Sequence, residues 1–375
     1  MNILITGTGF NNKGAELMFL AVVEHLRQNF PNARMAGDCF VSDGRMTCSL
    51  YRLTHRERGR LSILFDYLPE RTVWNWGFLR PCDIDVVIDA SGYCFSDLWS
   101  DEYVEGNVNS RIAYHRFGAK LVLLPQAFGP FQRAGVRKSC KSLFEKSSLI
   151  FPRDQESFEH VRELTGSDEK LHLAHDFTNI VQGFVPQSFD PKLAGAIGIL
   201  PNEKMIAKKE SQKENYLDFL VHCFQILTEY RVPYFLLCHQ NEDYKIVELL
   251  KSKWKTMPPV VSESNPLFIK GILGTCRFLI GSRFHGLING FSQGIPCIGT
   301  SWSHKYEALF KDYGCSEFLM TDLESKQSVN PLIASLMDDS SYQSAKNNIE
   351  KHATLLKTET QKMWGIVDDF LNPLS

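Results

Sequence analysis

One stretch of the chain, residues 277–310, most strongly limits the fold that this sequence can adopt. Its first part is the short apolar run Phe278–Ile280, which predicts a buried parallel strand. A turn at Gly281 ends the run, and apolar residues at helical spacing then predict a helix that closes at Gly294. A second apolar run, Pro296–Ile298, follows. The stretch therefore predicts a strand–turn–helix–strand unit, which is typical of open α/β sheets.

Polar and cationic side chains follow the two predicted strands of this unit. In open α/β sheets, ligands bind where a strand ends and the next helix begins, and the free N–H groups of a helix start favour an anion. An arginine there adds a planar donor, and a histidine adds a titratable group. A histidine or arginine at a helix start is often only structural, but five such groups at one sheet edge favour a functional site. The candidates are Ser282, Arg283, His285, His304 and Lys305.

The composition is that of an ordinary globular protein. The 375 residues are 43% apolar and 22% charged, which predicts two domains. The net charge of −2 does not favour nucleic-acid or membrane binding by charge alone. We expect no membrane span and no signal peptide, and hence a cytoplasmic protein. The 10 cysteines form no CxxC pair, which indicates reduced, mostly buried thiols rather than disulfides or a zinc site.

A glycine-rich turn follows the first predicted strand, Asn2–Thr6. Such a turn lets a phosphate or a sugar approach the backbone, and Asn12 and Lys13 are its candidate binding residues. The spacing does not fit the dinucleotide fingerprint, because Asn12 stands where a glycine is needed. It does not fit a P-loop either, because Ala15 follows Gly14. Classical dinucleotide and ATP binding are disfavoured, and a purely structural turn remains the alternative.

Two successive β/α alternations predict two doubly wound, Rossmann-like domains that face each other across a cleft. The predicted parts are an N-terminal domain at 1–181, a linker at 182–193, a C-terminal domain at 194–340 and a final helix at 341–375 that packs across the junction. The other predicted strands are Ala33–Phe40, Asp85–Asp89, Lys120–Leu124, Ser148–Phe151, Leu171–Ala174, Ala196–Leu200, Pro233–Cys238 and Val260–Val261.

The N-terminal half offers its own polar groups at strand ends. Gln126 supplies an amide in a turn that two prolines and a glycine restrict, and Arg153 lies at a strand-to-helix junction. The predicted cleft combines Arg153 with Arg283 and His285. We expect no metal site, because His172 and His175 on a strand would point to opposite faces.

Several segments resemble the polysaccharide pyruvyl transferase family. They are ILITGTGFNNKGAE at the start, LLPQAFGPF at 123–131, PRDQES at 152–157, GSRFHGLINGFSQGIPCIG at 281–299 and SWSHKYEALF at 301–310. The resemblance covers nearly the whole chain. It implies a cytosolic enzyme with a GT-B-like pair of Rossmann-like domains. Such an enzyme moves the enolpyruvyl unit of phosphoenolpyruvate onto a sugar, free or lipid-linked, and makes a pyruvate ketal without a metal or organic cofactor.

The same resemblance implies roles for individual residues. Arg153, Arg283 and His285 would bind phosphoenolpyruvate, and His285 would also be the catalytic acid/base. Two positions differ from the family's pattern on the expected acceptor side, Ala15 and the strand end Ala90–Gly92. Two other functions remain open. A GT-B-type glycosyltransferase would place the same arginine on the diphosphate of a nucleotide sugar, and a non-catalytic sugar-binding protein would tolerate loss of His285.

Overall fold

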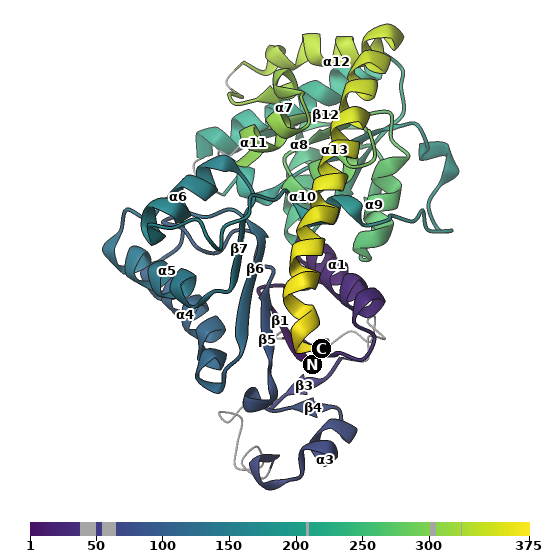
Figure 1. The fold of residues 1–375 in the computed structure, drawn as a ribbon. Coiled ribbons are helices and arrows are strands. Elements are labelled where there is room, and N and C mark those ends of the chain that lie inside the picture. Colours follow the sequence, from purple (N-terminus) through teal and green to yellow (C-terminus); the bar gives the residue numbers. More distant parts are fainter. Residues whose placement is uncertain (38–49, 55–64, 208–209, 301–304, 324) are drawn as a thin grey trace. The chain divides into compact units, whose positions relative to one another are not determined.

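The computed structural model describes residues 1–37, 50–54, 65–207, 210–300, 305–323 and 325–375. The chain divides into two compact units (Figure 1). Unit 1 comprises residues 1–10, 18–177 and 359–375, and unit 2 comprises residues 11–17 and 178–358. Helices α1 (Lys13–Asn29) and α13 (Asp339–Leu371) contribute residues to both units.

Unit 1 contains a five-stranded parallel sheet in the order β2-β1-β5-β6-β7. Its strands are β1 (Asn2–Thr6), β2 (Arg34–Gly37), β5 (Val86–Asp89), β6 (Lys120–Gln126) and β7 (Leu149–Pro152). Every residue of β1 and β5 is buried, as expected for strands that helices cover on both faces. Because β2 and β5 lie on opposite sides of β1, the strand order reverses at β1 and β5. The carboxyl ends of these two strands form the usual position of a ligand crevice.

The helices of unit 1 begin and end at recognisable signals. Besides part of α1, they are α3 (Glu70–Asn75), α4 (Asp101–Ile112), α5 (Ala134–Lys146) and α6 (Gln155–Thr165). The Asp154 side chain caps α6 by accepting a hydrogen bond from Ser157 N (2.7 Å), and Gly166 ends it in the left-handed region. Figure 1 shows α4, α5 and α6 together on one side of β6 and β7. A short parallel pair, β3 (Arg52–Leu53) and β4 (Phe78–Leu79), adjoins the edge of this sheet through a bridge between Tyr51 and Ala36 of β2.

Unit 2 contains a six-stranded parallel sheet in the order β10-β9-β8-β11-β12-β13. Its strands are β8 (Ile197–Leu200), β9 (Tyr234–Cys238), β10 (Val260–Ser262), β11 (Leu279–Gly281), β12 (Cys297–Thr300) and β13 (Leu319–Met320). Its helices are α7 (Glu210–Glu229), α8 (Tyr244–Lys253), α9 (Pro266–Gly274), α10 (Phe284–Phe291), α11 (Lys305–Asp312), α12 (Asn330–Met337) and the first part of α13. The strand order reverses between β8 and β11.

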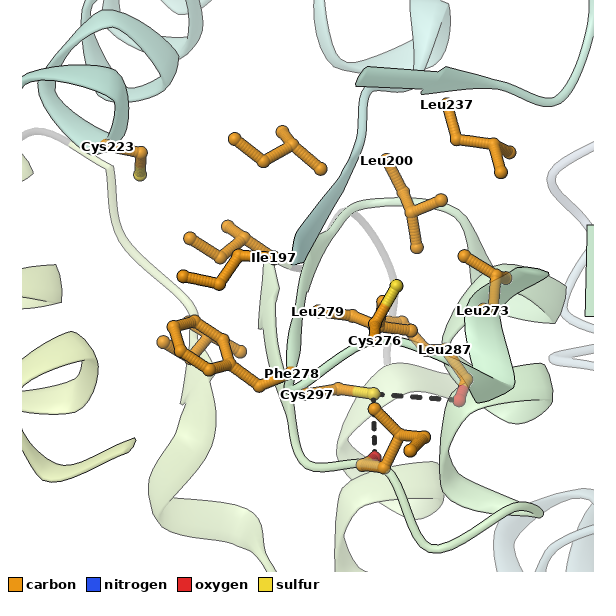
Figure 2. Packing of buried hydrophobic residues seen from close by; sticks show 14 of the residues in the cluster. Ile197, Leu200, Cys223, Leu237, Leu273, Cys276, Phe278, Leu279, Leu287 and Cys297 are labelled. Atoms are coloured by element: carbon orange, nitrogen blue, oxygen red, sulfur yellow. Dashed lines mark hydrogen bonds between the residues drawn. The ribbon is translucent and has the colours of Figure 1, made fainter. Parts of the chain in front are cut away.

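The core of unit 2 lies between its sheet and its helices. Figure 2 shows Leu279, Leu287 and Cys297 close together, and the Cys297 thiol lies 3.9 Å from the Leu287 carbonyl. Helix α10 can approach the sheet this closely because Gly290 has no side chain. A Cβ at Gly290 would come within 2.6 Å of Leu279 Cδ1 and 2.8 Å of Cys297 Sγ. This packing fixes the start of α10 relative to the strand that precedes it.

Most predicted strands are confirmed within a few residues, but one is wrong. Residues 171–174 do not form a regular strand, although an isolated bridge between Leu171 and Ile150 and the hydrogen bonds His172 N to Ile150 O (3.0 Å) and Ala174 N to Pro152 O (3.1 Å) hold them beside β7. The argument about the faces of His172 and His175 therefore loses its basis, and His175 instead pairs with Glu359 (2.9 Å). The strand predicted at Ala33–Phe40 is β2, and residues 38–40 lie outside the described part.

Two further features concern the chain as a whole. Among the described residues, no helix combines the length and the apolar character that crossing a membrane requires. The eight described cysteines are all free thiols, and seven of them are buried. Burial raises the pKa of Cys94 to about 11 and that of Cys276 to about 12, so these thiols stay protonated at neutral pH.

Candidate functional site

The site in unit 2 is built around the junction of β11 and α10. Arg283 is the residue that precedes the first turn of α10, with extended backbone angles (φ −100°, ψ 113°). Its carbonyl accepts the hydrogen bond from Leu287 N (3.0 Å) that closes this turn. The first N–H groups of a helix have no partner within the helix, so they point outward at this end. Arg283, a buried residue, therefore lies at a helix end that already favours an anion.

The buried Asp243 carboxylate orients Arg283. One carboxylate oxygen accepts hydrogen bonds from Arg283 Nη2 and from Glu203 N (3.1 Å). The other accepts from the backbone N–H groups of His239 and Gln240, both at 3.1 Å. These four donors come from the ends of β8, β9 and β11, so a single fully buried carboxylate connects three strand ends. The Arg283 Nε is buried and has no hydrogen-bond partner among the described residues.

A second histidine lies beside Arg283. His239 follows β9 and is 4% exposed. Burial, together with the charges of Arg283 and His285, lowers the pKa of His239 to about 3, so its ring is neutral at physiological pH. Its Nδ1 is buried without a hydrogen-bond partner in the described part of the chain. A neutral imidazole can donate or accept a hydrogen bond here, but it does not add a charge.

Ser282 is fully engaged inside the turn that it begins. Its carbonyl accepts from Asn202 Nδ2 (2.6 Å) and from the Tyr306 hydroxyl (2.8 Å). Its hydroxyl shares hydrogen bonds with the Tyr216 hydroxyl (2.9 Å) and with Thr300 Oγ1 (2.5 Å). These bonds join the ends of β8, β11 and β12. In this structure Ser282 therefore stabilises the backbone that carries Arg283.

The remaining candidates of unit 2 lie near the same helix or outside the described residues. The ring of His285 meets that of Phe284 edge-on, with 5.7 Å between centroids. The Lys305 ammonium lies 4.8 Å from the centre of the Phe284 ring, which places its charge beside the first turn of α10. His304 lies outside the described residues.

Asn12 and Lys13 organise the start of α1, and both belong to unit 2. The Asn12 side-chain oxygen accepts a hydrogen bond from Gly14 N (3.0 Å), and its carbonyl accepts from Glu16 N (2.9 Å). The Lys13 ammonium pairs with the Glu16 carboxylate at 2.7 Å. These contacts hold the first turn of α1 in a defined shape.

In unit 1, Arg153 lies directly after β7. It is 6% exposed, its Nη1 is 3.8 Å from Asp176 Oδ2, and its backbone N–H donates to the Gln126 carbonyl (3.1 Å). Like Arg283, Arg153 stands between a parallel strand and the helix that follows it, but β7 is the edge strand of its sheet whereas β11 lies at the reversal of strand order in unit 2. The structure thus brings Ser282, Arg283, His285 and Lys305 together in unit 2, and it places Arg153 and Gln126 at neighbouring strand ends of unit 1.

Gln126 belongs to a buried network around Asp89. Its amide donates to Asp89 Oδ1 (2.8 Å), and Arg111 Nε donates to Asp89 Oδ2 (2.7 Å). The Ser91 hydroxyl donates to the same carboxylate (2.7 Å), and a Cβ at Gly7 would meet that hydroxyl at 2.1 Å. Gly7 follows β1 and Asp89 ends β5, so this network occupies the point where the strand order of unit 1 reverses.

The sequence interpretation did not select Asp243, His239, Asp89 or Arg111 for the site. The position of a polar residue directly after an apolar strand could have indicated His239 and Asp89. No comparable signal marks Asp243 or Arg111, because each lies in or near a helix and reaches the site only through folding. Among the described residues, no group of three or more His, Cys, Asp or Glu side chains could hold a metal ion.

Comparison with known proteins adds a family and a fold. The family model for polysaccharide pyruvyl transferase matches residues 12–304. The Staphylococcus aureus MnaA–UDP structure superposes with a TM-score of 0.62 at 11% identity, over 99% of this chain and 96% of that chain. The structure of Anabaena Alr3699/HepE in complex with UDP and glucose superposes with a TM-score of 0.59 at 13% identity, over 98% of this chain and 99% of that chain. The structure of a glycosyltransferase from Rickettsia africae ESF-5 superposes with a TM-score of 0.59 at 12% identity, over 99% of this chain and 98% of that chain. The predicted GT-B-like architecture is confirmed.

Proposed function

This chain belongs to the polysaccharide pyruvyl transferase family, and from this premise we propose that it transfers the enolpyruvyl unit of phosphoenolpyruvate to a sugar. The product is a pyruvate ketal on a cell-surface glycan or on its free or lipid-linked precursor. We place the reaction in the cytoplasm, where phosphoenolpyruvate is available.

The observation that carries this proposal is the position of Arg283 at the start of α10. Phosphoenolpyruvate has a phosphate and a carboxylate, so its site needs cations and backbone N–H donors. Arg283 provides a guanidinium that Asp243 orients, and α10 provides the N–H groups of its first turn. Lys305 adds a positive charge beside the same turn. The resemblance to the family is the support for Arg153, after β7 in unit 1, as a further proposed binding residue for phosphoenolpyruvate.

The chemistry needs one positioned acid/base, and we assign that role to His285. A proton is added to the methylene carbon of phosphoenolpyruvate, and positive charge develops on the adjacent carbon. One sugar hydroxyl adds to that carbon and loses its proton. A second hydroxyl then displaces inorganic phosphate, and the ketal ring closes. The balance is phosphoenolpyruvate plus a diol giving a ketal plus phosphate. A histidine suits both proton transfers, because it can hold or release a proton near neutral pH.

The second candidate function is glycosyl transfer from a nucleotide sugar. The same helix start supports it, because the N–H groups that we assign to phosphoenolpyruvate can also bind a diphosphate, and structures of this fold with UDP are known. Their identity to this chain is only 11% and 13%, so they are evidence for the fold and not for the ligand.

A ligand-stability screen separates the two functions. We expect phosphoenolpyruvate to raise the melting temperature more than UDP, UDP-glucose or UDP-N-acetylglucosamine at equal concentration. The matched control is 2-phosphoglycerate, which carries a phosphate and a carboxylate but has no enol. It should bind and yet release no phosphate when a β-galactoside with free 4- and 6-hydroxyls is added. A larger shift with a UDP sugar would move the assignment to glycosyl transfer.

A further inference from the structure

The first turn of α1 contacts the candidate acid/base. Gly14 is the second residue of α1 and belongs to unit 2, as His285 does. A Cβ built on Gly14 would lie 2.2 Å from His285 Nδ1, 2.5 Å from Cγ and 2.8 Å from Cβ. The backbone at position 14 therefore lies directly against the imidazole, in a place where any side chain would overlap with it.

This overlap could not be relieved by a simple rotation of the ring. Of the three close atoms, rotation about χ1 moves Cγ and Nδ1, and rotation about χ2 moves Nδ1. Neither rotation moves the His285 Cβ. That atom would still be 2.8 Å from a Cβ at Gly14, a separation that real Cβ atoms essentially never show. Its position is set by the backbone of α10, whose packing against β11 and β12 is already close at Gly290. A methyl group at position 14 would therefore displace His285 or the turn that carries Gly14.

The turn itself is held in place by local bonds. Asn12 accepts from Gly14 N (3.0 Å) with its side chain and from Glu16 N (2.9 Å) with its carbonyl. The Lys13–Glu16 pair (2.7 Å) joins two residues of the same turn. On the side of α10, the Phe284 ring meets His285 edge-on at 5.7 Å. The His285 imidazole thus lies against Gly14 of α1 and against the ring of Phe284 in α10.

We propose that Gly14 is a positioning residue, which fixes the orientation of the His285 imidazole for proton transfer by allowing the start of α1 to pack directly on it. The inference rests on the proposed function, because the role of His285 comes from it. It gives the glycine-rich start of the chain a task other than phosphate binding. Reacting groups must be aligned closely, and a displacement of about 1 Å can lower a rate by about 10²-fold.

The first experiment compares Gly14→Ala with Gly106→Ala. Gly106 lies within α4, and a Cβ there would meet nothing within 4 Å, so this variant is a matched helical control. We expect Gly14→Ala to lower kcat for phosphate release by about 10-fold to 10²-fold while the Kd for phosphoenolpyruvate changes less than threefold. Gly106→Ala should change neither. Equal kcat values for the wild type and Gly14→Ala would overturn the proposal.

A double-mutant cycle tests whether Gly14 acts through His285. In the His285→Gln background, Gly14→Ala should cause no further loss of kcat, because the group that it misplaces is already absent. If the two losses multiply instead, Gly14 serves another part of the reaction and the proposal fails. The dependence of kcat on pH should also change in Gly14→Ala, which a general loss of folded protein would not cause.

A structural readout keeps this inference separate from the proposed function. The ring resonance of His285 is identified by its absence in His285→Gln, and we expect it to shift in Gly14→Ala and not in Gly106→Ala. An unchanged resonance overturns the role of Gly14, and a wild type without phosphate release overturns the proposed function alone. If Gly14→Ala does not fold, adding His285→Gly should restore the fold, since it removes every atom of the overlap. A double variant that stays unfolded would also contradict the proposal.

Discussion

The Asp243 carboxylate accepts a hydrogen bond from the guanidinium of Arg283, which lies 40 residues further along the chain. The carboxylate is fully buried and the Arg283 side chain is 10% exposed, so the pair is nearly removed from water. The same carboxylate also holds the backbone after β8 and β9. The direction of the Arg283 guanidinium is therefore set by residues that follow three strands, and the donor site that we propose in unit 2 depends on all of them.

We predict that Asp243→Asn destabilises the protein and weakens donor binding. The change leaves the Arg283 charge buried without its counter-charge, which costs about 3–5 kcal/mol in comparable pairs. Asp218→Asn is the control, because Asp218 pairs with Lys253 at 2.9 Å on the surface, where such pairs contribute about 1 kcal/mol or less. Unfolding in denaturant gives the free energy of unfolding of the wild type and of both variants. Similar losses in the two would show that the Asp243–Arg283 pair has no special importance.

Arg283→Lys should weaken phosphoenolpyruvate binding although the charge is retained. Lysine lacks the planar fork that bonds Asp243 and an anion at the same time, so we expect Kd to rise by about tenfold or more. Arg277→Lys is the matched control at a position where the guanidinium pairs with exposed Asp339. Calorimetric titration with phosphoenolpyruvate gives Kd for each. Normal binding by both Arg283→Lys and Arg153→Ala would place the anion site elsewhere, with Lys13 and Lys305 as the next candidates.

His285→Gln should separate chemistry from binding. The arginine and the helix start still hold the anion, so the Kd for phosphoenolpyruvate should stay within a few-fold of the wild type. Turnover should fall by about 10² to 10⁴, the usual contribution of a positioned proton-transfer group. Phosphate release and a melting curve check the two effects. A variant that folds, binds the donor and keeps near-normal turnover would remove His285 from the mechanism and leave His304 as the next candidate.

His239 predicts a specific dependence of stability on pH. Burial lowers the pKa of His239 from 6.5 to about 3, so between these values the unfolded state binds a proton that the folded state does not. Stability contributed by the neutral ring is present above pH 6.5 and is lost as the pH falls towards 3. At pH 5 the loss is about 2 kcal/mol.

The test is the unfolding free energy of His239→Gln at pH 7 and pH 5. We expect the difference between the two pH values to be smaller in this variant than in the wild type by about 2 kcal/mol. His115→Gln, at an exposed position, should leave the difference unchanged. If His239→Gln shows the full dependence of the wild type, another group causes it.

Local patterns in the sequence were enough to predict the strand–turn–helix unit that carries Arg283 and His285. Apolar runs and helical spacing depend on residues a few positions apart, so β11, α10 and β12 follow from the chain itself. The same reasoning failed at residues 171–174, where a short segment lies beside β7 through one bridge and two backbone hydrogen bonds but forms no regular strand. A strand at the edge of a sheet depends on its partner, and the partner is not visible in a local pattern.

The partners of these residues were decided only by the tertiary structure. Asp243 reaches Arg283 from 40 residues away, and Arg111 reaches Asp89 from 22 residues away. Nothing local in the sequence distinguishes these two from surface charges on a helix. Ser282 and Gln126 are predicted to bind a ligand, and the structure adds that each also holds a buried neighbour, Thr300 and Asp89 respectively. The sequence by itself determined where strands end and which charged groups follow them. Only folding decided which of those groups neutralise one another, because that choice depends on the order of strands in the sheet.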